Sequence, residues 1–367
     1  MGKPLLFISA GDPSGDNAVS HLITALKSMV PDVSFFGLGG PKLHQLGQEQ
    51  LAESRDLAVL GFWEVAQKYL FFRRLFFHCL EQIKKRRPAL VLLVDYPGFN
   101  LRLAEKIKPL GIPVVYYISP QVWAWGKGRL KEINNLVDLM MYILPFEREL
   151  YAENKVKSHF VGHYLLDDIP SAYIRSSLSP ENRLALLPGS RPQEIDRMLR
   201  PMLQAVAILR KKYDITAVIA GIRGRYDYEK ATRGLADKVR ITYDNARQVI
   251  HESRLVLSSS GTATLETGII GRPMVVVYKT GFVTYHIARR LVRLKMIGLV
   301  NLVLHDKAVP ELIQHRATPE MMAAELEKFL LDTQYTERVK AKLDRLPAVL
   351  GGTGASRRAA ALIREYL

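Results

Sequence analysis

The stretch from Ser258 to Gly268 reads Ser-Ser-Ser-Gly-Thr-Ala-Thr-Leu-Glu-Thr-Gly and changes from a buried strand to a helix within a few residues. The apolar run Leu-Val-Leu at 255–257 precedes it, and residues 262–270 have apolar positions at helical spacing. A strand that leads through a glycine turn into a helix leaves backbone N–H groups unpaired, and the helix dipole favours negative charge at that point. We interpret the stretch as a phosphate site; the alternative is a Ser/Thr-capped helix that binds nothing.

Four residues of this stretch are candidates for nucleotide binding. Gly261 lets the backbone approach a phosphate closely, and the hydroxyls of Ser260 and Thr262 add donors. Glu266 lies one helical turn further and is placed to reach a ribose hydroxyl. Together they predict that this turn binds a nucleotide.

A second sequence of strand, tight glycine turn and helix start lies at 186–191, which read Leu-Leu-Pro-Gly-Ser-Arg. We predict that Gly189, Ser190 and Arg191 bind a diphosphate, because a guanidinium fork matches phosphate oxygens and neutralises a leaving diphosphate without a metal. The alternative is an ordinary turn whose Arg191 pairs with Glu194. Neither turn has the Walker or the dinucleotide pattern, so we expect a nucleoside diphosphate held by the two turns.

The composition is that of a folded soluble protein, with 48% hydrophobic and 24% charged residues. A length of 367 residues predicts two domains rather than one. The single cysteine, Cys79, excludes an internal disulfide framework and a multi-cysteine metal site, and it favours a reducing cytoplasm. The first apolar run, 5–10, predicts a strand rather than a secretory signal, and no segment is long and apolar enough to span a bilayer.

Lys and Arg total 52 against 36 Asp and Glu, which gives a formal charge of +16. This excess favours an anionic partner: nucleic acid, anionic lipid or a phosphorylated substrate. The sequence carries no aromatic-interleaved nucleic-acid motif such as an RRM core, so we expect no nucleic-acid partner. The histidines lack metal-ligand spacing, so we expect no metal. We also expect no cofactor.

Short apolar strands alternate with helices along both halves of the chain, which predicts α/β domains with parallel sheets covered by helices on both faces. In the first half we expect strands at 5–10, 33–38, 89–95, 114–118 and 136–143, and helices at 17–29 and 101–110. In the second half we expect strands at 184–187, 215–220, 239–242, 255–258 and 274–277, and helices at 192–210, 262–270, 319–331, 337–346 and 355–367.

The pattern breaks between 165 and 182, which we interpret as a linker. The expected domains are therefore residues 1–170 and residues 171–350. A C-terminal helix at 351–367 has the position to pack back on the first domain.

The loops that follow the first-half strands carry unusual residues, and ligands of open α/β sheets bind at that edge. Asp95 ends an apolar strand there and is our candidate general base toward an incoming hydroxyl. The alternative is a carboxylate that only caps the next turn, and Asp12 and Asp16 are rival bases. The first of these loops also supplies predicted substrate-binding residues, namely Gly11, Ser14, Gly15 and Asp16.

The predicted helix at 67–87 has two different faces. A stripe at helical spacing should face the core; it comprises Phe72, Leu75, Phe76, Cys79, Leu80 and Ile83. On the other face Leu70 and Phe77 lie among the basic residues Arg73 and Arg74, which predicts a surface that rests on anionic lipid. The alternative is scattered exposed apolar residues, which are common. A second basic stretch at 282–295 suits either a phosphate pocket or the same lipid surface.

Six motifs together resemble the lipid-A-disaccharide synthase family. They are Ala-Gly-Asp-Pro-Ser-Gly-Asp (10–16), Asp-Tyr-Pro-Gly-Phe-Asn (95–100), Ser-Pro-Gln-Val-Trp-Ala-Trp (119–125), Leu-Pro-Gly-Ser-Arg (187–191), Ser-Gly-Thr-Ala-Thr-Leu-Glu (260–266) and Asn-Leu (301–302). They follow one another over nearly the whole chain, and the motif at 119–125 is quite specific. The chain departs from the family at Asp12-Pro13, where Glu-Ala is usual, and at Val300, where a proline is common.

The resemblance implies an inverting glycosyltransferase of the GT-B architecture, in which two Rossmann-like domains face each other across a cleft. It implies that the domain at 1–170 faces the acceptor and the membrane and that the domain at 171–350 binds the nucleotide sugar. The family reaction joins UDP-2,3-diacylglucosamine to 2,3-diacylglucosamine 1-phosphate and yields the β-1,6-linked disaccharide 1-phosphate and UDP. The family also implies a cytoplasmic protein that is peripheral on the bacterial inner membrane, with an anionic lipid surface as partner. It leaves open whether the enzyme forms an oligomer.

Position by position, the resemblance assigns roles to residues of this chain. Asp95 matches the family's candidate base, and Asn301 matches a polar residue near the cleft. The nucleotide side is matched by Arg191, Gly261, Thr262 and Glu266.

Two other functions remain as alternatives. A UDP-sugar epimerase of the same architecture would keep the turn around Glu266 but would need no basic, phenylalanine-bearing helix. A basic RNA-binding protein would use the charge, although the chain has no matching motif.

Overall fold

The computed structural model describes residues 3–53, 69–123, 128–175, 177, 181–233, 239–281 and 296–367. The predictions on Trp125, on most of the stretch 176–180 and on the basic stretch 282–295 lie outside the described residues. The chain divides into two compact units. Unit 1 comprises Met1–Asp168 and Leu350–Leu367, and unit 2 comprises Ile169–Val349.

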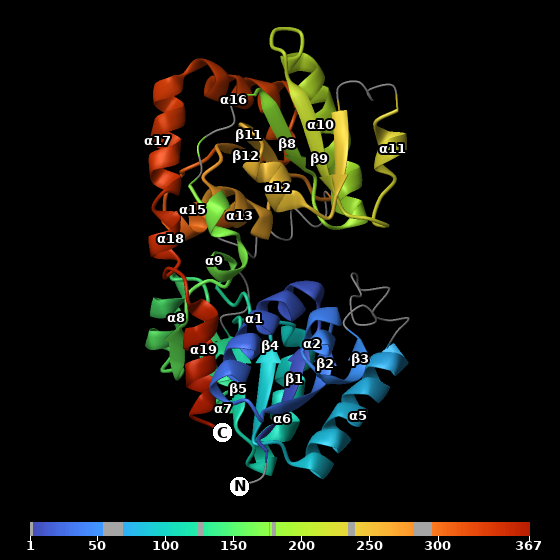
Figure 1. Ribbon diagram of the computed structural model, residues 1–367, viewed down its shortest axis with the longest axis vertical. Helices are drawn as coiled ribbons and strands as arrows, with labels where there is room; N and C mark the ends of the chain where they lie inside the picture. Colours follow the sequence, from blue (N-terminus) through green and yellow to red (C-terminus); the bar gives the residue numbers. More distant parts are fainter. Residues whose placement is uncertain are drawn as a thin grey trace. The chain divides into compact units, whose positions relative to one another are not determined.

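The described strands of unit 1 form a seven-stranded parallel sheet in the order β3-β2-β1-β4-β5-β6-β7 (Figure 1). Their bounds are β1 Leu5–Ala10, β2 Ser34–Gly39, β3 Glu49–Glu53, β4 Leu90–Val94, β5 Val114–Tyr117, β6 Leu139–Tyr142 and β7 Ser158–Phe160. All five residues of β4 are buried, as expected of a strand covered by helices on both faces.

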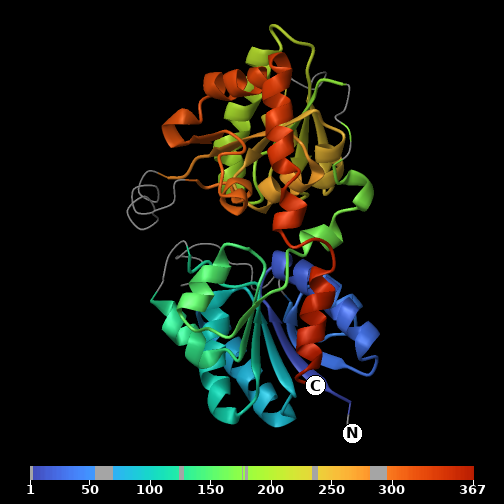
Figure 2. The ribbon, with the colours of Figure 1, turned by 90° about the vertical axis from the view of Figure 1, so that its left-hand side faces the viewer.

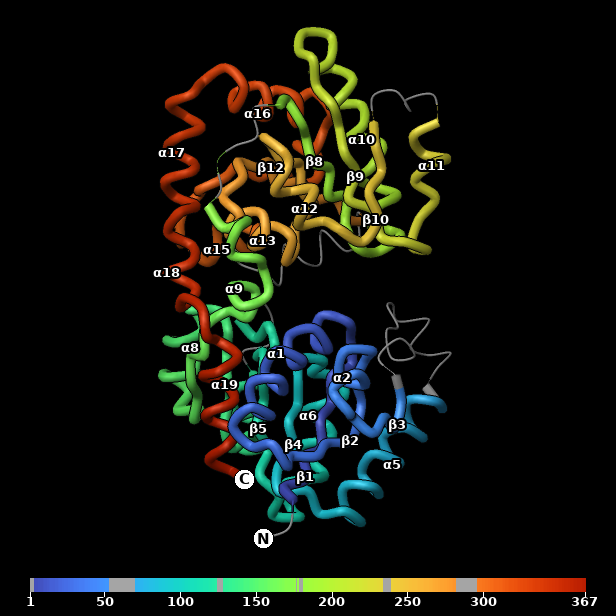
Figure 3. The backbone as a smooth tube through the Cα atoms, viewed as in Figure 1, coloured from blue at the N-terminus to red at the C-terminus, as the bar shows by residue number. Residues whose placement is uncertain are grey.

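The helices of unit 1 begin mostly in the loops that follow the strands. They are α1 Pro13–Met29, α2 Pro41–Gln45, α5 Tyr69–Arg86, α6 Pro97–Ile107, α7 Arg129–Leu136, α8 Glu147–Glu153, α9 Leu165–Asp168 and α19 Ala355–Arg364. The last helix, α19, packs along α1, so the blue and the red end of the chain lie side by side in this unit (Figures 2 and 3).

Unit 2 repeats the plan with a six-stranded parallel sheet in the order β10-β9-β8-β11-β12-β13. The strands are β8 Arg183–Leu187, β9 Thr216–Gly221, β10 Val239–Tyr243, β11 Leu255–Ser259, β12 Met274–Tyr278 and β13 Glu311–Ile313. The helices are α10 Pro192–Leu209, α11 Tyr228–Ala231, α12 Ala246–His251, α13 Thr262–Ile270, α15 Leu299–Leu304, α16 Pro319–Leu331, α17 Thr333–Leu343 and α18 Leu346–Val349.

The predicted α/β class with parallel sheets is confirmed in both units. One expected strand, at 136–143, is shorter in the structure, because α7 continues to Leu136 and β6 begins only at Leu139. The strands β3, β7 and β13 are additions to the expectation. Each is an edge strand, and edge strands carry a weaker apolar signal than strands buried on both faces.

The strand orders fix where ligands should bind. In unit 1 the chain builds outward from β1 in one direction and from β4 in the other; in unit 2 it does the same from β8 and β11. Open α/β sheets bind ligands at the carboxyl ends of the strands where the order reverses. We therefore expect ligands to bind at the loops after β1, β4, β8 and β11.

Candidate functional site

The structure brings the predicted loops of unit 1 together at its reversal point. Residue Ala10 at the end of β1 pairs with Val94 at the end of β4, so the loops that begin with Gly11 and Asp95 leave the sheet side by side. Asp12 is close enough to act electrostatically on the Asp95 carboxyl.

The backbone at Asp95 is held in an unusual conformation. Both Asp95 and Tyr96 have left-handed φ angles, 44° and 48°. Two side chains hold the main-chain carbonyl of Asp95: Asn100 Nδ2 donates to it at 2.8 Å, and the hydroxyl of Tyr116 donates to the same oxygen. Strained backbone of this kind clusters at functional sites, where surrounding contacts maintain it.

The pKa of Asp95 is raised to about 6 from its ordinary 3.8. Burial is the main cause, because desolvation disfavours the charged form; the negative charge of Asp12 adds to it, and the backbone N–H of Tyr96 opposes both. A carboxylate with this pKa is ionised at neutral pH and is basic enough to accept a proton during a reaction.

Gly11 is required by the ring of Tyr96. A Cβ atom at Gly11 would lie 2.5 Å from Tyr96 Cδ1, so any larger residue would displace the ring that covers this loop. Asp12 caps α1, accepting from the N–H of Gly15 at 2.7 Å, and Pro13 occupies the first turn. This cap gives the Asp12-Pro13 pair a structural reason to depart from the family pattern. Ser14 is exposed on the same loop.

Asp16 is buried and its carboxylate is used by the backbone. Its Oδ1 accepts from the backbone N–H groups of Gly40 at 2.8 Å and Leu43 at 3.2 Å. Its Oδ2 accepts from the backbone N–H of Lys42 at 3.1 Å. These bonds join α1 to the start of α2. Because three backbone donors hold this carboxylate, its geometry suits positioning of the loop.

In unit 2 the two glycine turns lie against each other. Ser258 pairs with Leu187 at the ends of β11 and β8, and a Cβ at Gly189 would lie 3.5 Å from Ser259 Oγ. Gly189 has a φ of 122°, a conformation that favours glycine, and a Cβ there would also lie 2.9 Å from Glu194.

Arg191 is the N-cap residue of α10 and its side chain is exposed. Its Nη1 donates to Glu194 Oε1 at 3.3 Å. An exposed ion pair of this kind contributes little to stability, so exchanging Glu194 for a phosphate would cost the guanidinium little free energy. Ser190, beside it, is exposed as well.

The start of α13 has the geometry predicted for a phosphate turn. Gly261 is the N-cap residue with φ 154°, and no side chain caps the helix. Thr262 is exposed at the first helical position, and Ser260 Oγ donates to the carbonyl of Ile297 at 3.0 Å. The first N–H groups of a helix without a side-chain cap are suited to an anion.

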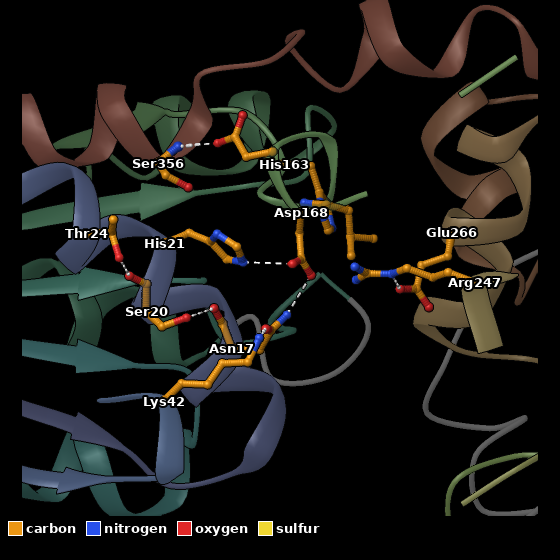
Figure 4. Close-up of polar contacts among 12 residues, drawn as sticks. Asn17, Ser20, His21, Thr24, Lys42, His163, Asp168, Arg247, Glu266 and Ser356 are labelled. Carbon is orange, nitrogen blue, oxygen red and sulfur yellow. Dashed lines mark hydrogen bonds and ion pairs between the residues drawn. The ribbon is translucent and has the colours of Figure 1, made fainter. Parts of the chain in front are cut away.

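Glu266 forms an ion pair that the sequence did not suggest. Arg247 on α12 donates through Nε to Glu266 Oε1 at 2.7 Å, and both side chains are largely buried (Figure 4). The pair fixes the carboxylate at one helical turn from the α13 N-terminus. Arg247 lies 19 residues away in the sequence, so only the fold brings the two together.

Asn301 is fully buried and its amide is occupied. Its Oδ1 accepts from the N–H of Val309 at 3.0 Å, and its Nδ2 donates to Glu311 Oε1 at 2.8 Å. Glu311 also accepts from the N–H groups of Ile297 and Gly298, at 2.9 and 3.0 Å. In this geometry Asn301, through Glu311, holds the loop that contacts Ser260.

The helix α5 carries the two faces that were predicted for it. The stripe Leu75, Cys79, Leu80 and Ile83 is buried in the core of unit 1, and the flanking Phe72 and Phe76 are partly buried against it. On the other face Leu70 is 62% and Phe77 is 55% exposed, and a shallow concavity of about 430 Å³ is lined by both of them with Arg73 and Arg74. Phe71, 41% exposed, extends the apolar surface and was not predicted.

A polar chain along α1 was also missed by sequence reasoning. The Asp168 carboxylate accepts from Asn17 Nδ2 at 2.8 Å and lies 2.8 Å from His21 Nε2, while Lys42 Nζ donates to Asn17 Oδ1 (Figure 4). These contacts link Asp168, where the segment Met1–Asp168 of unit 1 ends, to α1.

Comparison with known proteins finds relatives that match nearly the whole chain. Residues 6–362 match the family described as lipid-A-disaccharide synthetase. The lipid-A-disaccharide synthase of Anaeromyxobacter dehalogenans strain 2CP-1 is 41% identical over 368 residues, covering 97% of this chain and 95% of that protein. The synthase of Myxococcus xanthus is 37% identical over 374 residues, covering 99% and 98%.

Solved structures with the same fold are much less similar in sequence. A putative UDP-N-acetylglucosamine 2-epimerase from Listeria monocytogenes matches with a TM-score of 0.67 at 15% identity, covering 100% of this chain and 97% of that one. The calicheamicin glycosyltransferase CalG4 matches with a TM-score of 0.64 at 17% identity, covering 100% and 98%. These likenesses establish a fold shared by GT-B glycosyltransferases and epimerases.

Proposed function

The chain belongs to the lipid-A-disaccharide synthase family, and from this membership we propose how its residues divide the work of the reaction. The enzyme is a hexosyltransferase that joins UDP-2,3-diacylglucosamine to 2,3-diacylglucosamine 1-phosphate, forming the β-1,6-linked disaccharide 1-phosphate and UDP. Family membership decides against the epimerase and RNA-binding alternatives. In our proposal unit 1 takes the acceptor and unit 2 takes the UDP-sugar.

Asp95 is the general base of this proposal. The oxygen of the acceptor 6-hydroxyl forms a bond to the anomeric carbon of the donor, the bond from that carbon to the UDP oxygen breaks, and the hydroxyl proton passes to the Asp95 carboxylate. The observation that carries the assignment is the buried carboxyl with a pKa of about 6 at the reversal point of the unit 1 sheet.

UDP takes the electron pair of the broken bond, so negative charge grows on the diphosphate. The uncapped start of α13 and the exposed Arg191 stand at adjacent strand ends of unit 2, where they would stabilise that charge. Glu266, fixed by Arg247, would accept from a ribose hydroxyl. Gly189, Gly261, Ser190 and Thr262 would line the diphosphate.

The proposal is tested by supplying both substrates and measuring UDP and disaccharide together. One disaccharide 1-phosphate per UDP is the expected result. Release of UDP without a disaccharide, or epimerisation of the sugar at C2, would contradict the assignment of roles.

We also propose that the exposed face of α5 rests on the anionic inner-membrane surface, which makes the enzyme peripheral and cytoplasmic. Leu70, Phe71 and Phe77 offer apolar area, and Arg73 and Arg74 offer charge for lipid phosphates. Among the described helices none is both long enough and apolar enough to cross a membrane. Acyl chains of both substrates reside in a bilayer, so this contact would place the enzyme where its substrates are.

Phe77→Ser should weaken binding to anionic vesicles by roughly tenfold, because burying a half-exposed phenylalanine contributes about 1.5 kcal/mol. Arg73 and Arg74 together changed to Glu should weaken it at least as much, because each basic residue near an anionic surface contributes about 1 kcal/mol. Co-sedimentation with anionic vesicles measures both effects. Turnover of a detergent-dispersed short-chain acceptor should survive.

The matched control is Leu331→Ser, which removes an exposed leucine of unit 2 that is 67% exposed. This variant should bind vesicles as the parent does. If the Phe77 and arginine variants also sediment like the parent at moderate salt, α5 is not the membrane contact.

A further inference from the structure

Two carboxyl groups and a hydroxyl group lie in the loops that follow three neighbouring strands of unit 1. β5 lies between β4 and β6 in the sheet, and Asp95 follows β4, Ser119 follows β5, and Glu147 begins α8 shortly after β6. Because the strands are parallel, all three residues leave the sheet at its carboxyl edge. Glu147 and Asp95 are close enough for the charge of one to act on the other.

Glu147 is buried, with only 1% of its surface exposed. The hydroxyl of Ser119 is hydrogen-bonded to its Oε1, and the N–H of Leu144 donates to its Oε2 at 3.3 Å. Among the residues that the structure describes, no cation forms an ion pair with it. A buried carboxyl that is bonded only to neutral groups favours its protonated form.

The surroundings reinforce this preference. Burial raises the pKa of Glu147 to about 8, and the negative charge of Asp95 contributes to the rise, while the bonds from Ser119 and Leu144 oppose it. Tyr151, beside Glu147, has a buried hydroxyl, and its own pKa is raised by burial and by the negative charge of Glu147. Glu147 is therefore uncharged at the pH at which Asp95 is ionised.

We propose that Glu147 is a positioning residue that works as an uncharged acid. Through Ser119 it holds the loop 119–123 beside Asp95, and because it carries no charge, Asp95 remains the base of the site. The proposal rests on the assignment of Asp95 in the proposed function. Trp123 in this loop packs edge-on against Phe146, the residue before Glu147, with ring centroids 5.1 Å apart, so the loop is fastened to the start of α8 at two points.

Ionisation of Glu147 would place a second buried negative charge in the region. Among the described residues, the titratable groups that act on Asp95 and Glu147 or lie against them are Asp12 and Tyr96 in the loops after β1 and β4, Tyr116 on β5 and Tyr151 on α8; none of these four is a cation. The new charge would repel ionised Asp95, and this repulsion opposes ionisation of Glu147 although the bonds from Ser119 and Leu144 favour its carboxylate. Activity should therefore fall on the alkaline side as Glu147 loses its proton.

The first test compares the pH dependence of kcat/KM in three proteins: the parent, Glu147→Gln and Glu149→Gln. The parent should rise through about pH 6 and fall through about pH 8. The amide of Glu147→Gln resembles the protonated acid and cannot ionise, so this variant should keep the acid limb and lose the alkaline limb. Glu149, exposed on the same helix, is the matched control and should leave both limbs in place.

Glu147→Ala and Ser119→Ala should lower kcat by roughly tenfold, because each removes the bond that holds the loop. Glu147→Gln should recover most of the turnover that Glu147→Ala loses. An alkaline limb that persists unchanged in Glu147→Gln would overturn the proposal, as would an equal loss of kcat in the Gln and Ala variants.

The second test needs no substrate, so it separates this proposal from the proposed function. Glu147 has a raised pKa in the folded protein, about 8 against 4.5, so its contribution to stability is complete below about pH 4.5 and is lost as the pH rises through about 8. The Tm of the parent should therefore fall relative to that of Glu147→Gln between about pH 5 and about pH 8. Parallel Tm curves would overturn the uncharged acid even in an active enzyme. Divergent curves in a protein without transferase activity would contradict only the reaction.

Discussion

Asp95→Asn should lower turnover by roughly a hundredfold or more while UDP binding stays at the parental affinity. A general base acts on the acceptor hydroxyl in the transition state, so its loss affects kcat rather than the nucleotide. The amide keeps the size of the carboxylate but accepts no proton. Steady-state assays with both substrates measure the turnover, and calorimetry measures UDP binding.

The fold should survive this substitution for a local reason. Asp95 has a left-handed φ of 44°, and asparagine tolerates that region better than other side chains. The hydrogen bonds from Asn100 and Tyr116 go to the main-chain carbonyl and do not depend on the carboxylate. Asp138→Asn is a matched control, because Asp138 lies before β6 at the opposite edge of the same sheet.

Asp12→Asn distinguishes the rival base. Asparagine caps a helix as well as aspartate does, so α1 should keep its N-terminus. If Asp95 is the base, this variant should keep most of its turnover, and its acid limb should move to lower pH, because the charge that raises the pKa of Asp95 has gone. If Asp95→Asn instead stays within about threefold of the parent and Asp12→Asn loses a hundredfold, Asp12 is the base.

Glu266→Gln should weaken UDP binding by roughly tenfold to a hundredfold, because a hydrogen bond from a ribose hydroxyl to a carboxylate contributes about 1.5–3 kcal/mol. The same change also breaks the ion pair with Arg247. A double-mutant cycle with Arg247→Gln separates the two effects. If the carboxylate binds the ribose, the Arg247 variant alone should lose less affinity than the Glu266 variant.

Glu252→Gln is the matched control for this experiment. Glu252 pairs with Arg183 at the amino end of β8, so it lies at the opposite edge of the same sheet from the glycine turns. Its loss should leave UDP affinity unchanged. Calorimetry that gives the parental affinity for Glu266→Gln would exclude the ribose contact.

Much of the site was predictable because each of its motifs consists of consecutive residues. The turns at Gly189 and Gly261 are each a strand, a glycine and a helix start, and all three signals come from neighbouring positions. The stripe of α5 follows from helical periodicity in the same way. The residue roles carried by these motifs remain predictions until the variants are measured.

The contacts of other site residues could not be predicted, because buried polar groups find their partners across the fold. Asp16 has the residue type of a substrate ligand, yet its carboxylate accepts from backbone groups 24 to 27 residues away. Asn301 has the residue type of a cleft residue, yet its amide is occupied by Val309 and Glu311. A sequence motif specifies the residue type, and the neighbouring loops decide which atoms it meets.

By itself the sequence determined the α/β class, the glycine turns at the strand ends, the two faces of α5 and the carboxylate at Asp95, because local backbone preference and apolar periodicity depend only on nearby residues. Tertiary structure alone decided that Arg247 fixes Glu266 and that Glu147 is buried beside Asp95. Strand order places the ends of β4, β5 and β6 next to one another, and burial at that edge then sets which carboxyl is ionised. Neither the neighbours of a strand nor the desolvation of a side chain is encoded in a short stretch of sequence, so both emerge only when the sheet is assembled.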